Sequence, residues 1–228
     1  MPPPLFGRKD DEVINRVFHQ IWINKAQPEL PEQFKRYRDT WLAHHPDWEY
    51  RLWNLENLDF RPECESLLSQ CQQPAQMADL LRIEILFRHG GVYVDTDFEC
   101  LRSIDDLLHG VSGFACSEDG RYLASGILGA TQSAPWLRRI IDRFPEQLGI
   151  HPVNIETGPV FLTSTLLRYG TDAGFILFPT NYFYPFNYHT KNRSEVDLSK
   201  SYAVHHYADS WKTPPSLWRR ILRRIRRR

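Results

Sequence analysis

Residues 76–97 constrain the fold more than any other stretch of this chain. The apolar pattern over residues 76–89 predicts a helix that is buried on much of its circumference. Gly90 and Gly91 follow and predict its end, because glycine adopts the left-handed backbone that stops a helix. The β-branched and aromatic residues 92–94 then indicate a short strand. A helix, a glycine turn and a strand in this order predict an α/β fold.

Two aspartates, Asp95 and Asp97, follow this strand directly, at the edge where open α/β sheets place their ligands. Carboxylates are hard oxygen ligands, and Mg2+ or Mn2+ binds carboxylate and phosphate oxygens together. On the preceding helix, Asp79 and Arg82 are spaced i and i+3 and therefore share one face. They suit a sugar hydroxyl and a phosphate, or they pair with each other at the surface. A bare Asp-x-Asp also occurs in solvated turns, so the motif alone does not define a site.

Ordered segments around this motif carry a family resemblance: 19–23, 46–54, 78–82, 90–97, 157–159, and His205-His206 ahead of Ser210-Trp211. Together they resemble the DXD core and flanking segments of glycosyltransferase family 32. That family includes yeast-type initiating mannosyltransferases and bacterial capsule and lipopolysaccharide sugar transferases, and it is related to the glucosylating domains of clostridial toxins. The similarity runs from about residue 16 to about residue 212.

This resemblance implies the GT-A fold, a Rossmann-like α/β fold with a single mixed sheet flanked by helices. It implies transfer of a sugar from a nucleotide-diphosphate donor, with a UDP-sugar favoured over GDP-mannose, and with retention of configuration. Asp95 and Asp97 would hold Mn2+, or Mg2+, against the diphosphate. Asp79 would accept hydrogen bonds from donor hydroxyls, and Arg82 would face the sugar or the phosphate. The acceptor would be a glycan or a lipid-linked glycan, as in bacterial surface polysaccharide synthesis.

Three further residues gain expected roles from the same resemblance. Trp22, near the end of the first expected strand, matches the Trp that stacks on the base in the toxin relatives, although core packing explains a Trp equally simply. Gly158 lies in a Thr-Gly-Pro loop at a helix start, which suits a phosphate or sugar hydroxyl, or merely caps the helix. His205 and His206 end the last expected strand and point to opposite faces. The family's spacing selects His205 as the third metal ligand.

The net charge of the chain is zero, but its basic residues are concentrated at the C-terminus. Residues 219–228 hold seven arginines, so the rest of the chain is acidic. Apolar residues at helical spacing accompany them, which is typical of a helix lying on an anionic membrane. We therefore divide the chain into a glycosyltransferase catalytic domain, 1–216, and a basic amphipathic tail, 217–228. The alternatives are a disordered basic tail or a nucleic-acid contact, and nucleic-acid binding is disfavoured because such proteins usually spread basic residues over a folded face.

The sequence predicts a cytoplasmic protein bound peripherally to the inner face of the membrane. Its first twelve residues lack the apolar core of a signal peptide, and no run of about 20 apolar residues exists. The four cysteines lack CxxC spacing, so neither zinc nor a redox pair is indicated.

Two other regions and two other functions complete the expectations. Residues 113–117 and 122–129 are expected to form two strands joined by a turn, and the aromatic residues 181–188 to bind an acceptor or to fold onto the core. Haloacid-dehalogenase phosphatases also place Asp-x-Asp after a strand, but near the N-terminus and with Thr or Val where this chain has Glu99. A non-catalytic sugar-binding module would explain the aromatic residues but not Asp95 and Asp97 with a late histidine.

Overall fold

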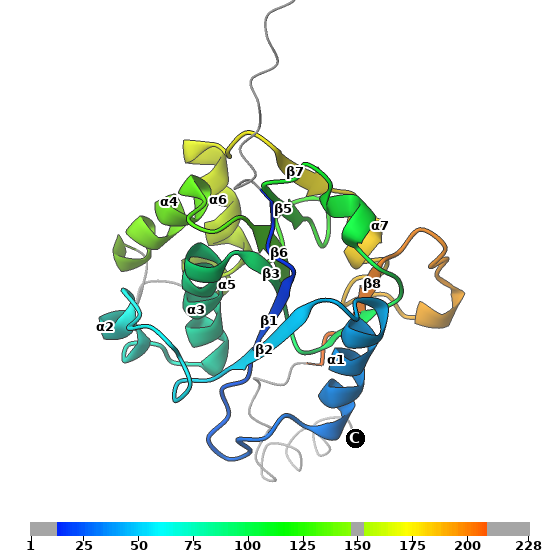
Figure 1. The fold of residues 1–228 in the computed structure, drawn as a ribbon, viewed down its shortest axis with the longest axis horizontal. Coiled ribbons are helices and arrows are strands. Elements are labelled where there is room, and N and C mark those ends of the chain that lie inside the picture. Colours follow the sequence, from blue (N-terminus) through cyan, green and yellow to red (C-terminus); the bar gives the residue numbers. More distant parts are fainter. Residues whose placement is uncertain (1–12, 147–152, 209–228) are drawn as a thin grey trace, which may run out of the picture.

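The computed structural model describes residues 13–146 and 153–208, which form a mixed sheet with helices on both faces (Figure 1). The strands run in the order β2-β1-β3-β6-β5-β7 across the sheet. In chain order they are β1 (Val17–Ile21), β2 (Glu49–Trp53), β3 (Gly91–Val94), β5 (Gly113–Cys116), β6 (Ile127–Ala130) and β7 (Phe175–Phe178). β6 is antiparallel to its neighbours β3 and β5, while β1, β2 and β3 are parallel. The carboxyl ends of β1, β3 and β5 therefore meet at one edge.

A second, two-stranded sheet joins β4 (Phe98–Cys100) to β8 (Ala203–His205). The predicted α/β class is confirmed, but the expected single sheet is supplemented by this small one, and the last expected strand lies in it. β4 is not signalled by the sequence. The antiparallel register places Phe98 opposite His205, so the end of the described chain returns to the aspartates that follow β3.

The central helix α3 (Pro74–His89) and the turn after it match the sequence prediction. Gly90 has φ of 64° and Gly91 has φ of 91°, a region that side chains rarely tolerate. A Cβ on Gly91 would also lie 2.6 Å from the carbonyl oxygen of Val17 on β1. The two glycines are therefore required both by the backbone conformation and by the close approach of two strands.

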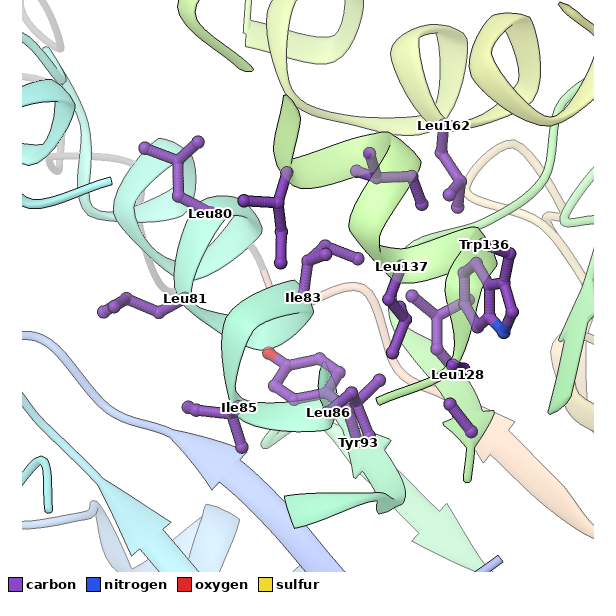
Figure 2. Close-up of a cluster of buried hydrophobic side chains, with 14 of the residues drawn as sticks. Leu80, Leu81, Ile83, Ile85, Leu86, Tyr93, Leu128, Trp136, Leu137 and Leu162 are labelled. Atoms are coloured by element: carbon purple, nitrogen blue, oxygen red, sulfur yellow. The ribbon is translucent and has the colours of Figure 1, made fainter. Parts of the chain in front are cut away.

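Helices and small elements cover both faces of the main sheet. One face packs against α3, α4 (Pro135–Arg143) and α6 (Pro159–Tyr169), with a buried core that includes Leu80, Leu86, Tyr93, Leu137 and Leu162 (Figure 2). The other face is covered by α1 (Glu32–His44), the small sheet and α7 (Thr180–Phe183), around Phe18, Trp41, Val92, Phe98 and Phe114. The shorter elements are α2 (Glu65–Leu68), α5 (Val153–Glu156) and 3-10 turns at Asp105–Leu108, Phe144–Glu146 and Arg193–Glu195.

Two regions differ in detail from the expectations. Only 127–130 forms a strand in the predicted 122–129 segment, and the residues before it contribute an isolated bridge between Ser117 and Leu123. The aromatic segment folds back onto the core, because Phe183 and Tyr184 are buried while Tyr188 is exposed. Ser210, Trp211 and the predicted tail lie outside the described residues. Every helix within the described ranges is too short or too polar to traverse a bilayer.

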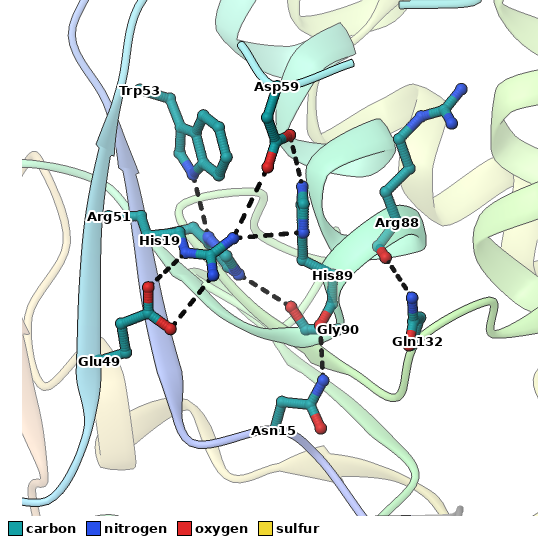
Figure 3. Close-up of polar contacts among 10 residues, drawn as sticks. All are labelled: Asn15, His19, Glu49, Arg51, Trp53, Asp59, Arg88, His89, Gly90 and Gln132. Atoms are coloured by element: carbon teal, nitrogen blue, oxygen red, sulfur yellow. Dashed lines mark hydrogen bonds and ion pairs between the residues drawn. The ribbon is translucent and has the colours of Figure 1, made fainter. Parts of the chain in front are cut away.

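A polar network ties the amino end of β3 to β1 and β2 (Figure 3). Trp53 donates its indole N–H to His19 Nδ1 at 3.0 Å, so this nitrogen accepts, and Nε2 carries the proton that it donates to the Gly90 carbonyl at 2.9 Å. Burial lowers the pKa of His19 to about 4, so the ring is neutral at pH 7. We call the residues His19, Arg51, Trp53, Asp59, His89 and Gly90 the Gly90 cluster.

Candidate active site

The three predicted metal ligands converge at the carboxyl end of β3. Asp95 follows β3, Asp97 precedes β4, and His205 ends β8. One ligand atom of each residue lies within 4.8 Å of the ligand atoms of the other two. Within the described part of the chain, these three side chains are close enough together to hold a metal ion. Their side chains are 29%, 12% and 14% exposed, so a ligand can reach them.

Asp97 is fixed by three hydrogen bonds that reach its side chain or backbone. Its Oδ1 lies 3.0 Å from His205 Nε2, its Oδ2 accepts the Ala208 N–H at 2.8 Å, and its carbonyl accepts the His206 N–H at 2.9 Å. Burial alone would raise the pKa of Asp97, but the bonds from His205 and Ala208 outweigh it and lower that pKa. Burial alone would lower the pKa of His205, but its contact with Asp97 raises it. Asp97 is therefore an anion at neutral pH, as a cation ligand must be.

Arg82 lies between Asp79 and Asp95. Its Nη2 is 3.0 Å from Asp79 Oδ1, its Nη1 is 3.5 Å from Asp95 Oδ1, and the guanidinium lies 4.5 Å from the Tyr93 ring centroid. Burial raises the pKa of both carboxyls, and Arg82 opposes that rise. With Asp79 and Arg82 only 8% and 6% exposed, a simple surface pair is the wrong interpretation. Direct contacts of Asp79 and Arg82 with a donor stay predictions. The contact that the structure shows for Arg82 on this side is the ion pair with Asp95.

The Thr-Gly-Pro loop reaches the same group of residues. Gly158 is the N-cap residue of α6, as predicted, and the hydroxyl of Thr157 donates to Asp79 Oδ2 at 2.8 Å. The start of α6 is thus tied to α3 beside the site. The role of Gly158 toward a phosphate stays a prediction. We call Asp79, Arg82, Asp95, Asp97 and His205 the DXD cluster.

Trp22 and His206 both pack against aromatic side chains of α1. Trp22 is 8% exposed, packs against Phe34 at 5.5 Å between ring centroids, and donates its indole N–H to the Gln27 carbonyl at 2.9 Å. The structure thus shows core packing, and base stacking by Trp22 stays a prediction. His206 turns away from the DXD cluster, stacks on Tyr37 and lies 2.9 Å from Glu99. As expected from strand geometry, one histidine of the pair contacts Asp97.

Several residues of the site were not singled out from the sequence. The Tyr93 hydroxyl donates to Asp95 Oδ1 at 2.6 Å, and the Gly126 carbonyl accepts the Asp95 N–H at 2.7 Å. Glu118 follows β5 at the same edge of the sheet, where burial raises its pKa and His205 opposes the rise. Tyr93 lies two positions before Asp95 in the motif segment itself, but no spacing in the sequence links Gly126 or Glu118 to the DXD motif. Their one signal is position, since Glu118 directly follows a predicted strand.

Comparison with known proteins agrees with the motif. Residues 31–112 match a family described as glycosyltransferase sugar-binding region containing DXD motif. An inositol phosphoceramide mannosyltransferase of Schizosaccharomyces pombe is 28% identical over 160 residues, which are 66% of this chain but only 44% of that protein. An uncharacterized glycosyltransferase of Acanthamoeba polyphaga mimivirus is 24% identical over 214 residues, covering 87% of this chain and 84% of the viral protein. The chain therefore spans less than half of the yeast relative and most of the viral one.

Solved structures agree with the fold. The ligand-free glycosyltransferase domain of the YGT toxin superposes with a TM-score of 0.51 at 10% identity, covering 77% of this chain and 84% of that one. Its UDP-bound form gives a TM-score of 0.50, covering 74% and 80%. At such low identity the likeness concerns the fold alone. The chain therefore has the fold of GT-A glycosyltransferases, and its central segment is similar to their DXD-containing sugar-binding region. The match over residues 31–112 and the relatives agree with the family-32 resemblance that the sequence shows.

Proposed function

We propose that this chain transfers a sugar from a nucleotide-diphosphate donor to a hydroxyl of a glycan or lipid-linked glycan, with a divalent cation at the DXD cluster. The observation that carries this proposal is the convergence of Asp95, Asp97 and His205 at the carboxyl end of β3. Two carboxylates and an imidazole suit Mn2+, whereas Mg2+ prefers oxygen ligands alone. Bound there, the cation would neutralise charge on the leaving nucleoside diphosphate.

The protein's own groups prepare the carboxylates for a ligand. Tyr93 and Arg82 hold Asp95 by Oδ1, and Ala208 holds Asp97 by Oδ2. Carboxylates that are oriented in advance need little reorganisation when a ligand binds, and such supporting contacts are a large part of the performance of metal sites. We assign these three residues a positioning role.

Relatives and structural neighbours support a choice of donors to test. The S. pombe relative is named an inositol phosphoceramide mannosyltransferase, which supports GDP-mannose, and the toxin domain carries UDP, which supports UDP-sugars. We propose a UDP-sugar first and GDP-mannose second, with retention of configuration. The basic amphipathic composition of residues 217–228 supports a lipid-linked acceptor at the inner face of the membrane, in surface polysaccharide synthesis.

The test is donor hydrolysis and binding with a panel of UDP- and GDP-sugars in Mn2+, Mg2+ or EDTA. Wild type should release nucleoside diphosphate from one donor only when metal is present, and Asp97→Ala should not. Asp106→Ala is the matched control, because Asp106 is an almost fully exposed aspartate outside the site. Binding of a sugar without turnover of any donor would indicate a sugar-binding module instead. Absence of binding to every nucleotide sugar would overturn the proposal.

A further inference from the structure

Tyr184 places a buried hydroxyl beside the DXD cluster. The residue is 2% exposed, and its hydroxyl has no hydrogen-bond partner among the described residues. A second buried atom of this site, His205 Nδ1, is likewise without a partner within the same ranges. A hydroxyl that is buried without a partner destabilises the fold, whereas phenylalanine in its place would avoid that cost. A tyrosine is therefore expected here only if something else takes the hydrogen bond.

Gly126 shows where this hydroxyl points. A Cβ added at Gly126 would lie 2.8 Å from the Tyr184 hydroxyl and 2.8 Å from Asp95 Oδ2. The hydroxyl and the carboxylate oxygen thus flank the same small space, which only a glycine leaves open. The other Asp95 oxygen, Oδ1, is already held by Tyr93 and Arg82. The Oδ2 side is the side on which a ligand oxygen would meet both groups.

The Tyr184 ring is held rigidly in this orientation. It packs edge-on against Phe98 at 5.2 Å and against His205 at 5.4 Å between centroids. Its backbone N–H caps α7 by donating to the Thr180 carbonyl at 2.8 Å. The Tyr202 N–H donates to the Tyr182 carbonyl at 2.7 Å and ties the segment to the strand that carries His205. Because the ring is packed in this way, the position of its hydroxyl oxygen is fixed.

We propose that Tyr184 is a positioning residue of the donor site, whose hydroxyl donates a hydrogen bond to an oxygen of the ligand held at Asp95. The inference rests on the proposed function, because it assumes that Asp95 binds that ligand. The oxygen can belong to the cation's hydration shell, the diphosphate or the donor sugar. These sources share one chemistry, a hydrogen-bond acceptor next to Asp95 Oδ2.

The experiment compares wild type, Tyr184→Phe and the control Tyr182→Phe. The control removes the hydroxyl of a partly exposed tyrosine that lies two positions before Tyr184. Thermal unfolding is measured without ligand, with Mn2+ alone, with Mn2+ and UDP or GDP, and with Mn2+ and the nucleotide sugar. Ligand-free Tyr184→Phe should unfold at the wild-type temperature or above it, because a costly unpaired hydroxyl is gone. Its ligand affinity should fall about tenfold, and Tyr182→Phe should behave as wild type.

The series of ligands also identifies the oxygen that Tyr184 contacts. If Tyr184→Phe already binds Mn2+ alone more weakly, the oxygen belongs to the hydration shell. If affinity first falls with the nucleotide, the oxygen belongs to the diphosphate, and if it falls only with the nucleotide sugar, the oxygen belongs to the sugar. The inference is overturned if Tyr184→Phe binds all three as wild type does, or if it lowers the ligand-free unfolding temperature while binding stays normal. Failure of wild type to respond to any ligand would instead overturn the proposed function, and this inference with it.

Discussion

The two ends of strand β3 carry polar clusters of opposite character. At the amino end, the Gly90 cluster forms its hydrogen bonds within the protein, since both ring nitrogens of His19 and both of His89 have protein partners (Figure 3). At the carboxyl end, the DXD cluster crowds carboxylates around one guanidinium and one imidazole, and His205 Nδ1 has no partner among the described residues.

This difference separates a structural network from a binding site. Satisfied buried polar groups stabilise a fold, whereas unsatisfied ones and crowded like charges destabilise it. A protein keeps the second arrangement where a ligand completes it. The comparison therefore predicts that substitutions at the amino end affect stability and that substitutions at the carboxyl end affect activity.

Asp95→Asn should give the largest effect on turnover and the clearest difference between the two ends of β3. The amide keeps the shape of the side chain but removes an anionic ligand, so donor turnover should fall by about 10^3-fold or more. Because burial raises the pKa of Asp95, losing its charge should change the free energy of unfolding by no more than about 1 kcal/mol. Turnover assays and urea unfolding measure the two quantities, with Asp106→Asn as control. Retained turnover would contradict the assignment.

His19→Ala should show the converse. It leaves the Trp53 indole N–H and the Gly90 carbonyl without their partner and opens a cavity in a fully buried place. The free energy of unfolding should fall by roughly 3–4 kcal/mol. Below its unfolding temperature the variant should still turn over donor at close to the wild-type rate. The control is His44→Ala, at an exposed helix position. Lost turnover with unchanged stability would erase the distinction between the clusters.

The same histidine predicts a pH dependence of stability. Its pKa is about 4 when folded, against about 6.5 when unfolded, so the unfolded chain binds the proton first as pH falls. The contribution is fully present above pH 6.5 and declines to its minimum near pH 4, by up to about 3 kcal/mol. Urea unfolding of wild type and His19→Ala at several pH values checks this. Equal pH slopes for the two proteins would show that His19 is not held neutral.

Tyr93→Phe should give the smallest effect and refine the boundary of the site. The change removes one hydrogen bond to Asp95 Oδ1 while Arg82 still contacts that oxygen. Supporting contacts of this kind are worth roughly 10–100-fold in metal affinity or activity. Titration with Mn2+ and turnover assays should both show a loss in that range. A loss of stability with normal Mn2+ affinity would show that Tyr93 has a structural role instead of a role in the metal site.

The sequence predicted the local elements of this fold well, because their signals are local. α3 has a buried helical pattern and two glycines at its end, and β1 and β2 are apolar or aromatic runs between turns. The DXD motif lies within one continuous stretch and was found there. His205 was found through family resemblance, since 108 positions separate it from Asp97 and no spacing rule connects them.

What the sequence did not predict depends on long-range packing. β4 forms only because β8 pairs with it, and Gly126 and Tyr184 reach Asp95 only through the arrangement of β6 and the segment after α7. Trp22 has the composition of a stacking residue, but its burial is decided by Phe34 on another element. Each of these outcomes follows from contacts between distant segments, which residue patterns do not encode.

Uptake of Mn2+ by the folded protein tests the central claim most directly. The free-ion signal in electron paramagnetic resonance is followed as protein is added in the presence of UDP or GDP. The account predicts that wild type and folded His19→Ala each take up a single ion per chain, and that Asp95→Asn takes up none in the same range. Equal uptake by wild type and Asp95→Asn would contradict a cation site at the carboxyl end of β3.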